Sequence, residues 1–194
     1  TLEVGAAGRL GGGAYAGNIA NNGTFIYSGT NAQTLSGVIS GTGALTQNNS
    51  SSTLTLSGNN TYTGTTTISA GTLLISSSGR LGGGNYTGNI SNSGTLLYNG
   101  TTAQTLSGVI SGAGAFTKNG TGTLILSGSN SYSGGTTVNA GTLTLSGAST
   151  GGGAVMVDGG TMNIQGNLTL GSGQFTVGNA GAGVVNQSAG TVSI

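Results

Sequence analysis

The chain repeats itself at a spacing of 71 residues. The segment Gly8–Gly13 returns as Gly79–Gly84, and Ala32–Gly41 returns as Ala103–Gly112. Between residues 8–48 and 79–119, 30 of 41 positions are identical. A repeat of this regularity places the same local structure next to itself, so it favours a stacked architecture over one irregular core.

The repeats have unequal lengths. Asn60 matches Asn130 at a spacing of 70, so one residue has been lost between segments 49–52 and 119–121, which marks a loop. We therefore expect one continuous domain over 1–194. It consists of internal repeats 1–71 and 72–141 and a diverged continuation, 142–194.

Apolar residues arrive in short alternating bursts, such as Leu54-Thr55-Leu56 and Leu143-Thr144-Leu145. This period of two predicts β-strands, and no segment has the spacing of an amphipathic helix. Glycine-rich chains are often disordered linkers, but 34% apolar residues in this pattern argue against that. We expect an all-β fold with essentially no α-helix.

A signal of Gly, then Thr or Ala, then an apolar residue begins many of the expected strands. Most successive signals are 19 to 30 residues apart, the length of one β-solenoid coil. They occur at Gly23, Gly43, Gly71, Gly94, Gly114, Gly122, Gly141, Gly160 and Gly190. The spacing predicts roughly nine coils, about three in each long repeat, and a rod about 40 Å long at a strand spacing of about 4.8 Å.

The composition excludes several classes of function. The chain has no His or Cys, so it has no Ser-His-Asp triad, thiol nucleophile, imidazole or thiolate metal site, or disulfide. Three Lys and Arg residues are too few for a nucleic-acid interface, and no apolar run is long enough to span a membrane. Glu3 and Asp158 are too far apart in the chain to pair as catalytic carboxylates. We expect no enzymatic activity, cofactor or metal.

Tyrosines are the first candidates for binding a partner. The six tyrosines form three pairs related by the repeat, and exposed rings of this kind stack on sugars. The candidates are Tyr27, Tyr98, Tyr62 and Tyr132. Because each lies close to a Gly or Asn turn, packing at the corners of coils is the alternative.

Arginines are the second candidates. Arg9 and Arg80 precede triple glycines at the same place in the two repeats. Either could bind a carboxylate of a partner, and a solvated surface side chain is the alternative. No helix or Lys-Ser/Thr pair follows the glycines, so we expect corners there and not phosphate loops.

Threonine-rich strands raise the possibility of ice binding. Such a face needs Thr at the same place in every coil, and the sequence does not repeat Thr in that way. Ordinary strand threonine is therefore the favoured interpretation.

The segment Gly122–Leu143 closely resembles the passenger-associated repeat of bacterial autotransporters. Residues 53–73 form a weaker copy, and 166–181 also look like passenger sequence. The resemblance implies a right-handed, single-stranded parallel β-helix that is exported through a Gram-negative outer membrane and displayed on the cell or released. In that family the repeat is structural, and other segments usually carry the activity.

We therefore expect an extracellular structural or stalk module. One alternative is an adhesin that binds glycans or proteins of a cell surface. The other is a fibre subunit that assembles end to end through open solenoid edges. The start at Thr1-Leu2-Glu3-Val4 has neither an initiator Met nor a signal peptide, and no membrane barrel is recognisable, so we expect a piece of a longer protein.

Overall fold

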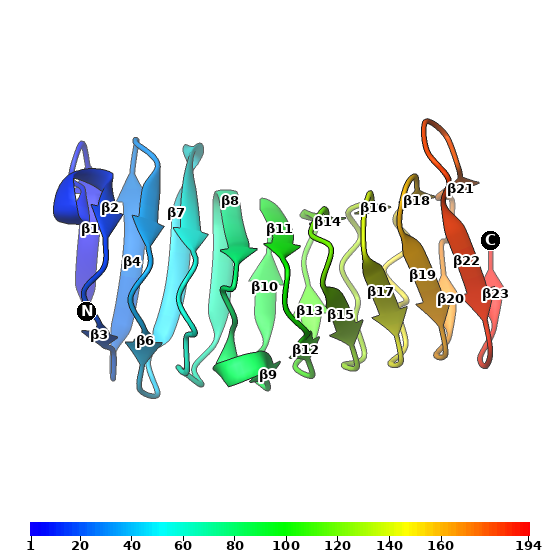
Figure 1. Ribbon diagram of the computed structural model, residues 1–194, viewed down its shortest axis with the longest axis horizontal. Helices are drawn as coiled ribbons and strands as arrows, with labels where there is room; N and C mark the ends of the chain where they lie inside the picture. Colours follow the sequence, from blue (N-terminus) through cyan, green and yellow to red (C-terminus); the bar gives the residue numbers. More distant parts are fainter.

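The computed structural model describes residues 1–194 as a parallel β-solenoid of about ten turns with essentially no helix. Each strand pairs in parallel with strands of the neighbouring coils, and the chain advances along one axis from its N-terminal to its C-terminal end (Figure 1). The predicted fold class is confirmed, with about one coil more than expected.

The largest sheet runs the whole length of the solenoid. In hydrogen-bonded order its main path consists of β1 (Leu2–Ala6), β4 (Thr24–Gly29), β7 (Ala44–Leu56), β8 (Thr66–Ser77), β11 (Thr95–Gly100), β14 (Ala115–Lys118), β16 (Thr136–Val138), β18 (Val155–Val157) and β21 (Phe175–Val177). Four short strands join this path from the side: β2 (Ala14–Tyr15), β5 (Gln33–Leu35), β10 (Ile90–Asn92) and β13 (Ile110–Ser111).

Three smaller sheets complete the walls. The second sheet consists of β9 (Asn85–Tyr86), β12 (Gln104–Leu106), β15 (Thr123–Leu126), β17 (Thr142–Leu145), β19 (Thr161–Ile164) and β22 (Val184–Gln187). The other two are the pairs β3 (Ile19–Ala20) with β6 (Ile39–Ser40), and β20 (Leu168–Thr169) with β23 (Val192–Ser193).

Glycine meets two requirements at the corners. The first two triple-glycine segments form 3-10 turns, η1 (Leu10–Gly13) and η2 (Gly82–Gly84), in which Gly83 has a φ of 64°. Other glycines allow close approach of neighbouring coils. A Cβ at Gly58 would lie 2.1 Å from the carbonyl oxygen of Gly37, so no larger residue fits there.

The sequence repeat and the coils have different periods. We use the word stack for residues that pair with one another in successive coils. One stack consists of Phe25, Leu45, Thr66 and Ile90. The repeat equivalent of Phe25 is Leu96, which lies six residues beyond Ile90 and pairs with Leu73 in a neighbouring stack. A repeat is therefore longer than the three coils expected, and its equivalent residues lie on different faces.

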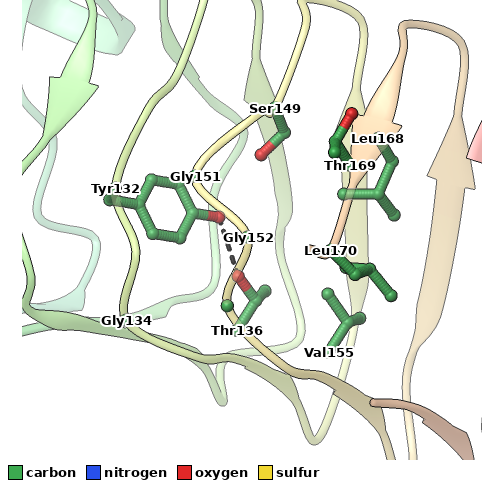
Figure 2. A pocket seen from close by; sticks show the side chains of 11 residues that line it. Tyr132, Gly134, Thr136, Ser149, Gly151, Gly152, Val155, Leu168, Thr169 and Leu170 are labelled. Atoms are coloured by element: carbon green, nitrogen blue, oxygen red, sulfur yellow. Dashed lines mark hydrogen bonds between the residues drawn. The ribbon is translucent and has the colours of Figure 1, made fainter. Parts of the chain in front are cut away.

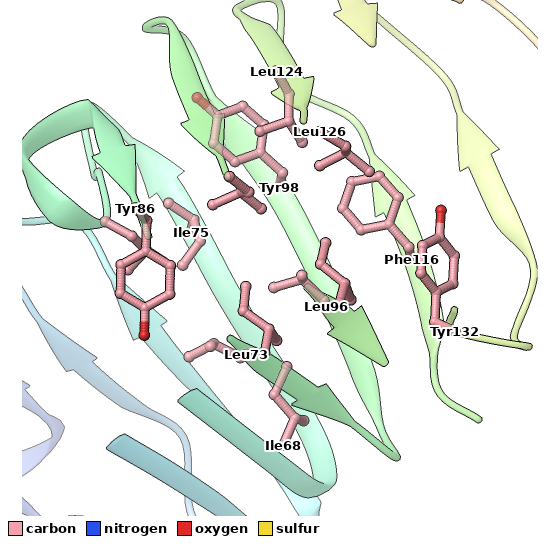
Figure 3. Packing of buried hydrophobic residues seen from close by; sticks show 14 of the residues in the cluster. Ile68, Leu73, Ile75, Tyr86, Leu96, Tyr98, Phe116, Leu124, Leu126 and Tyr132 are labelled. Carbon is pink, nitrogen blue, oxygen red and sulfur yellow. The ribbon is translucent and has the colours of Figure 1, made fainter. Parts of the chain in front are cut away.

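The core follows from the alternation seen in the sequence. In β4, Phe25 and Tyr27 are buried, whereas Thr24 and Ile26 are partly exposed. The 32 buried apolar residues form one cluster, and Figure 3 shows how rings and aliphatic side chains of successive coils pack on one another. The hydrophobic core is thus a set of parallel stacks along the axis.

Leu54 tests this register. It is fully buried, whereas its neighbour Thr55 is partly exposed. We expect Leu54→Ala to lower the free energy of unfolding by about 2–5 kcal/mol, because it leaves a cavity. The control Thr55→Ala should change it by about 0.5 kcal/mol or less. Urea denaturation followed by circular dichroism measures both, and equal losses would contradict the register.

Candidate functional site

The four candidate tyrosines lie in the core. Their exposed fractions are 0% for Tyr27 and Tyr62, 2% for Tyr98 and 5% for Tyr132. The reason is visible in β4 and β11, where Tyr27 and Tyr98 take the same inward phase of the strand as the apolar residue two positions before. Since only exposed rings stack on sugars, these four do not form a glycan-binding face.

Tyrosine hydroxyls link neighbouring coils. The hydroxyl of Thr66 lies 2.8 Å from that of Tyr62 and 2.7 Å from that of Tyr86. The hydroxyl of Tyr86 also donates to the carbonyl of Gly64, and the two rings meet edge to face with centroids 5.5 Å apart. Burial raises the pKa of Tyr62 well above its ordinary value, so the phenol stays protonated and serves as a structural hydrogen-bonding group.

The second repeat lacks the third member of this chain. The hydroxyls of Tyr132 and Thr136 are 2.7 Å apart, but no tyrosine of the next coil reaches Thr136. A cavity of about 10 Å³ lies beside them, against Ser149 and the glycines 151–153 (Figure 2). This volume has room for about one water molecule, so it is too small for an organic ligand.

The two candidate arginines have different surroundings. Arg9 is exposed on the N-terminal coil. Arg80 is partly buried one repeat later, and its Nε donates to the hydroxyl of Thr102 at 3.2 Å. The structure therefore leaves Arg9 available at the surface and gives Arg80 a structural contact. A partner for either residue stays a prediction.

Lys118 is a buried titratable residue that the sequence analysis did not single out. Its exposed fraction is 0%, and its Nζ donates to the carbonyls of Gly120 and Ala140, the latter at 3.1 Å. The same Nζ lies 5.4 Å from the ring centroid of Tyr98. Burial lowers the pKa of Lys118 from 10.5 to about 8. Its signal was the inward phase of the strand, two residues after Phe116.

Gln47 occupies the equivalent place in the first repeat. Its Nε2 donates to the carbonyls of Ser52 at 3.1 Å and Asn49 at 3.3 Å, whereas its Oε1 is buried without a partner. Gln47 and Lys118 thus have a common role, because each brings a nitrogen donor to inward-facing carbonyls of a corner. Lys118 does so without a contacting carboxylate.

Buried asparagines hold another type of corner. Asn60 accepts a hydrogen bond from the Ile39 N–H at 2.9 Å and donates to the carbonyls of Gly58 and Arg80 at 2.9 and 3.1 Å. Asn130 makes the corresponding bonds one repeat later, with the Ile110 N–H and the Gly128 carbonyl. Each side chain therefore replaces backbone pairing at a place where the strand turns.

The acidic residues do not form a site. The carboxylate of Glu3 accepts a hydrogen bond from the Ser28 hydroxyl at 2.5 Å, and that of Asp158 accepts from the Gly181 N–H at 2.9 Å. No group of three or more potential metal-ligating His, Cys, Asp or Glu residues is present. The two carboxylates therefore make separate local contacts.

One outward stack contains much of the exposed threonine. It crosses eight coils of the largest sheet. In order, the residues are Thr34, Thr55, Leu74, Leu97, Thr117, Thr137, Met156 and Thr176. Because Leu and Met interrupt the threonines, the row is not the regular Thr array that ice binding requires.

Asn60 can be tested against its exposed neighbour Asn59. Asn60→Ala should lower the free energy of unfolding by about 3 kcal/mol, because it leaves buried backbone groups of Ile39 and Arg80 without partners. Asn59→Ala should cost about 0.5 kcal/mol or less. Urea denaturation of both variants gives the comparison. A loss for Asn60→Ala no larger than that of the control would show that the corner does not depend on this amide.

Lys118 predicts a rise of stability with pH. Its pKa is about 8 in the folded chain and near 10.5 when unfolded, so the unfolded state binds more protons between these values. We expect the free energy of unfolding to increase by about 2 kcal/mol from pH 7 to pH 10, at about 1.4 kcal/mol per pKa unit. Chemical denaturation at a series of pH values measures this.

The control is Lys118→Gln, which introduces the residue found at position 47 and should lose the rise with pH. Above pH 10 the buried tyrosines act in the opposite direction, because their raised pKa values let the unfolded chain lose protons first. The comparison therefore ends at pH 10. A rise of the same size in both proteins would assign it to another group.

Comparison with known families agrees with this architecture. A family model described as Passenger-associated-transport-repeat matches residues 49–75, 116–144 and 140–164. The first two matches contain the segments 53–73 and 122–143, which carried the resemblance, and both include a buried Asn corner. The third extends into the continuation 142–194.

No curated protein and no solved structure gives a significant match. The resemblance drawn from the sequence is nevertheless confirmed by the three repeat matches. With the ladder of parallel strands and the repeated Asn and Tyr corners, they identify this chain as a β-solenoid that carries passenger-associated transport repeats.

Proposed function

We propose that this chain is a structural stalk segment of an autotransporter passenger, which holds other parts of its protein at a distance from the cell. The observation that carries the proposal is the ladder of parallel strands that extends from β1 to β23. The largest cavity has room for about one water, and the buried polar groups mostly join neighbouring coils. These features support a mechanical role and no catalytic one.

Display outside a Gram-negative cell is part of the proposal. It is supported by the transport repeats at 49–75, 116–144 and 140–164. The absence of Cys agrees with it, because a disulfide formed before export would obstruct an unfolded chain during passage. None of the structure's helices has the length and apolar character to cross a membrane.

Assembly through the ends is a second candidate. Large apolar side chains are exposed near both ends, with exposed fractions of 49% for Leu2, 47% for Val184 and 78% for Ile194. Edge strands also present unpaired N–H and C=O groups there. Glycan binding has less support, since the four candidate tyrosines are buried.

Electron microscopy with light scattering separates the two candidates. A stalk segment should give single particles of 18.4 kDa. Ten coils at about 4.8 Å should form rods roughly 45 Å long. Filaments that lengthen with protein concentration would support end-to-end assembly instead. Round particles of the same mass would contradict the rod on which the stalk role depends.

A further inference from the structure

The first coil is a copy of a coil found in the middle of the molecule. Residues 1–20 correspond to 72–91 at the repeat spacing, and the backbone agrees in detail. Ala6 and Ser77 are equivalent and have φ values of 51° and 56°, the only non-glycine residues with positive φ. The 3-10 turns η1 and η2 follow at equivalent places.

In the middle of the molecule this coil lies on a particular corner, Gly58–Thr66. The Asn60 side chain donates to the Arg80 carbonyl at 3.1 Å, and the Gly83 N–H donates to the Asn60 carbonyl at 2.8 Å. The Tyr86 hydroxyl bonds to Thr66 and Gly64. The groups that recognise the corner therefore belong to the segment Arg80–Tyr86.

The same groups are uncovered at the N-terminal end. Leu10 and Tyr15 are partly exposed, whereas their equivalents Leu81 and Tyr86 have exposed fractions of 1% and 0%. Leu2 is 49% exposed, whereas its equivalent Leu73 is fully buried. We call the surface formed by Leu2, Arg9, Leu10, Gly12 and Tyr15 the N-terminal end surface.

We propose that the N-terminal end surface binds a solenoid coil whose corner has the sequence of Gly58–Thr66, Gly-Asn-Asn-Thr-Tyr-Thr-Gly-Thr-Thr. The established contact between Gly58–Thr66 and Arg80–Tyr86 is the template. The second Asn of the corner donates to the Arg9 carbonyl and accepts the Gly12 N–H, and its last Thr bonds to the Tyr15 hydroxyl. The partner is thus another passenger-type repeat, in the same polypeptide or another.

The C-terminal end of a second copy does not present this chemistry. Its last corner reads Ser188-Ala189-Gly190-Thr191-Val192 and contains neither Asn nor Tyr. Stacking of one copy on the next would therefore leave the Arg9 carbonyl and the Tyr15 hydroxyl without the partners that Arg80 and Tyr86 have. The inference concerns one end of the solenoid and does not depend on the stalk role.

The test lengthens the full chain by placing a second copy of residues 1–71 before Thr1. Gly71 of the added copy then precedes Thr1 as Gly71 precedes Thr72 in the chain. Hydrogen exchange with mass spectrometry should show that residues 9–20 exchange at least about tenfold more slowly than in the unextended chain, approaching the rates of residues 80–91.

Two variants of the added copy sharpen the result. Thr66→Val in that copy removes the hydroxyl partner of Tyr15 with little change in shape, and it should return part of the exchange at residues 9–20. Asn59→Ala in the same copy is the control and should retain the protection, because this side chain is exposed.

Two outcomes would overturn the proposal. One is unchanged exchange at residues 9–20 in the extended chain, with the added copy itself protected. The other is protection of residues 9–20 in the unextended chain that increases with concentration, together with a growing mass in light scattering. That result would assign the surface to a second copy.

Discussion

The structure depends on backbone pairing between coils at the spacing of parallel strands, about 4.8 Å. Every group that enters a corner must fit this spacing and every inward carbonyl needs a donor. Glycine meets the first condition where chains approach most closely, as Gly58 does below Gly37. The amide of Asn60, the hydroxyl of Tyr86 and the ammonium of Lys118 meet the second. The polar interior is therefore a consequence of the stacking.

The same spacing accounts for the low charge. Residues in one stack are neighbours at about the strand spacing, so a charge repeated in each coil would face its own sign above and below. Amides avoid this cost, because one end donates while the other accepts. Asn139 donates to Asn119 at 2.7 Å, and Asn186 donates to Asn163 at 3.0 Å. A repeat protein of this type thus gains surface hydrogen bonds from the side chains that carry no charge.

Much of the fold could be predicted because strands and coils leave periodic signals. The alternation at Leu54-Thr55-Leu56 gave the strand phase that the structure shows. The same alternation places Tyr27 inside, but a tyrosine is compatible with either side of a wall, so the sequence left packing and binding as alternatives. Lys118 was overlooked for a related reason, since lysine is rarely buried without a counter-ion. The offset between repeat and coil could not be seen, because corners absorb extra residues, as between Asn48 and Thr53.

The offset between repeat and coil has a consequence for how such a molecule acquires new surface properties. Phe25 and Leu96 occupy the same place in the repeat but lie in neighbouring stacks. When a gene segment of this length is duplicated, an outward residue next to such a position reappears turned about the axis. Duplication therefore distributes a feature around the circumference. A straight line of identical side chains would require separate substitutions in each coil, whereas a rod that meets its surroundings in every direction arises by copying alone.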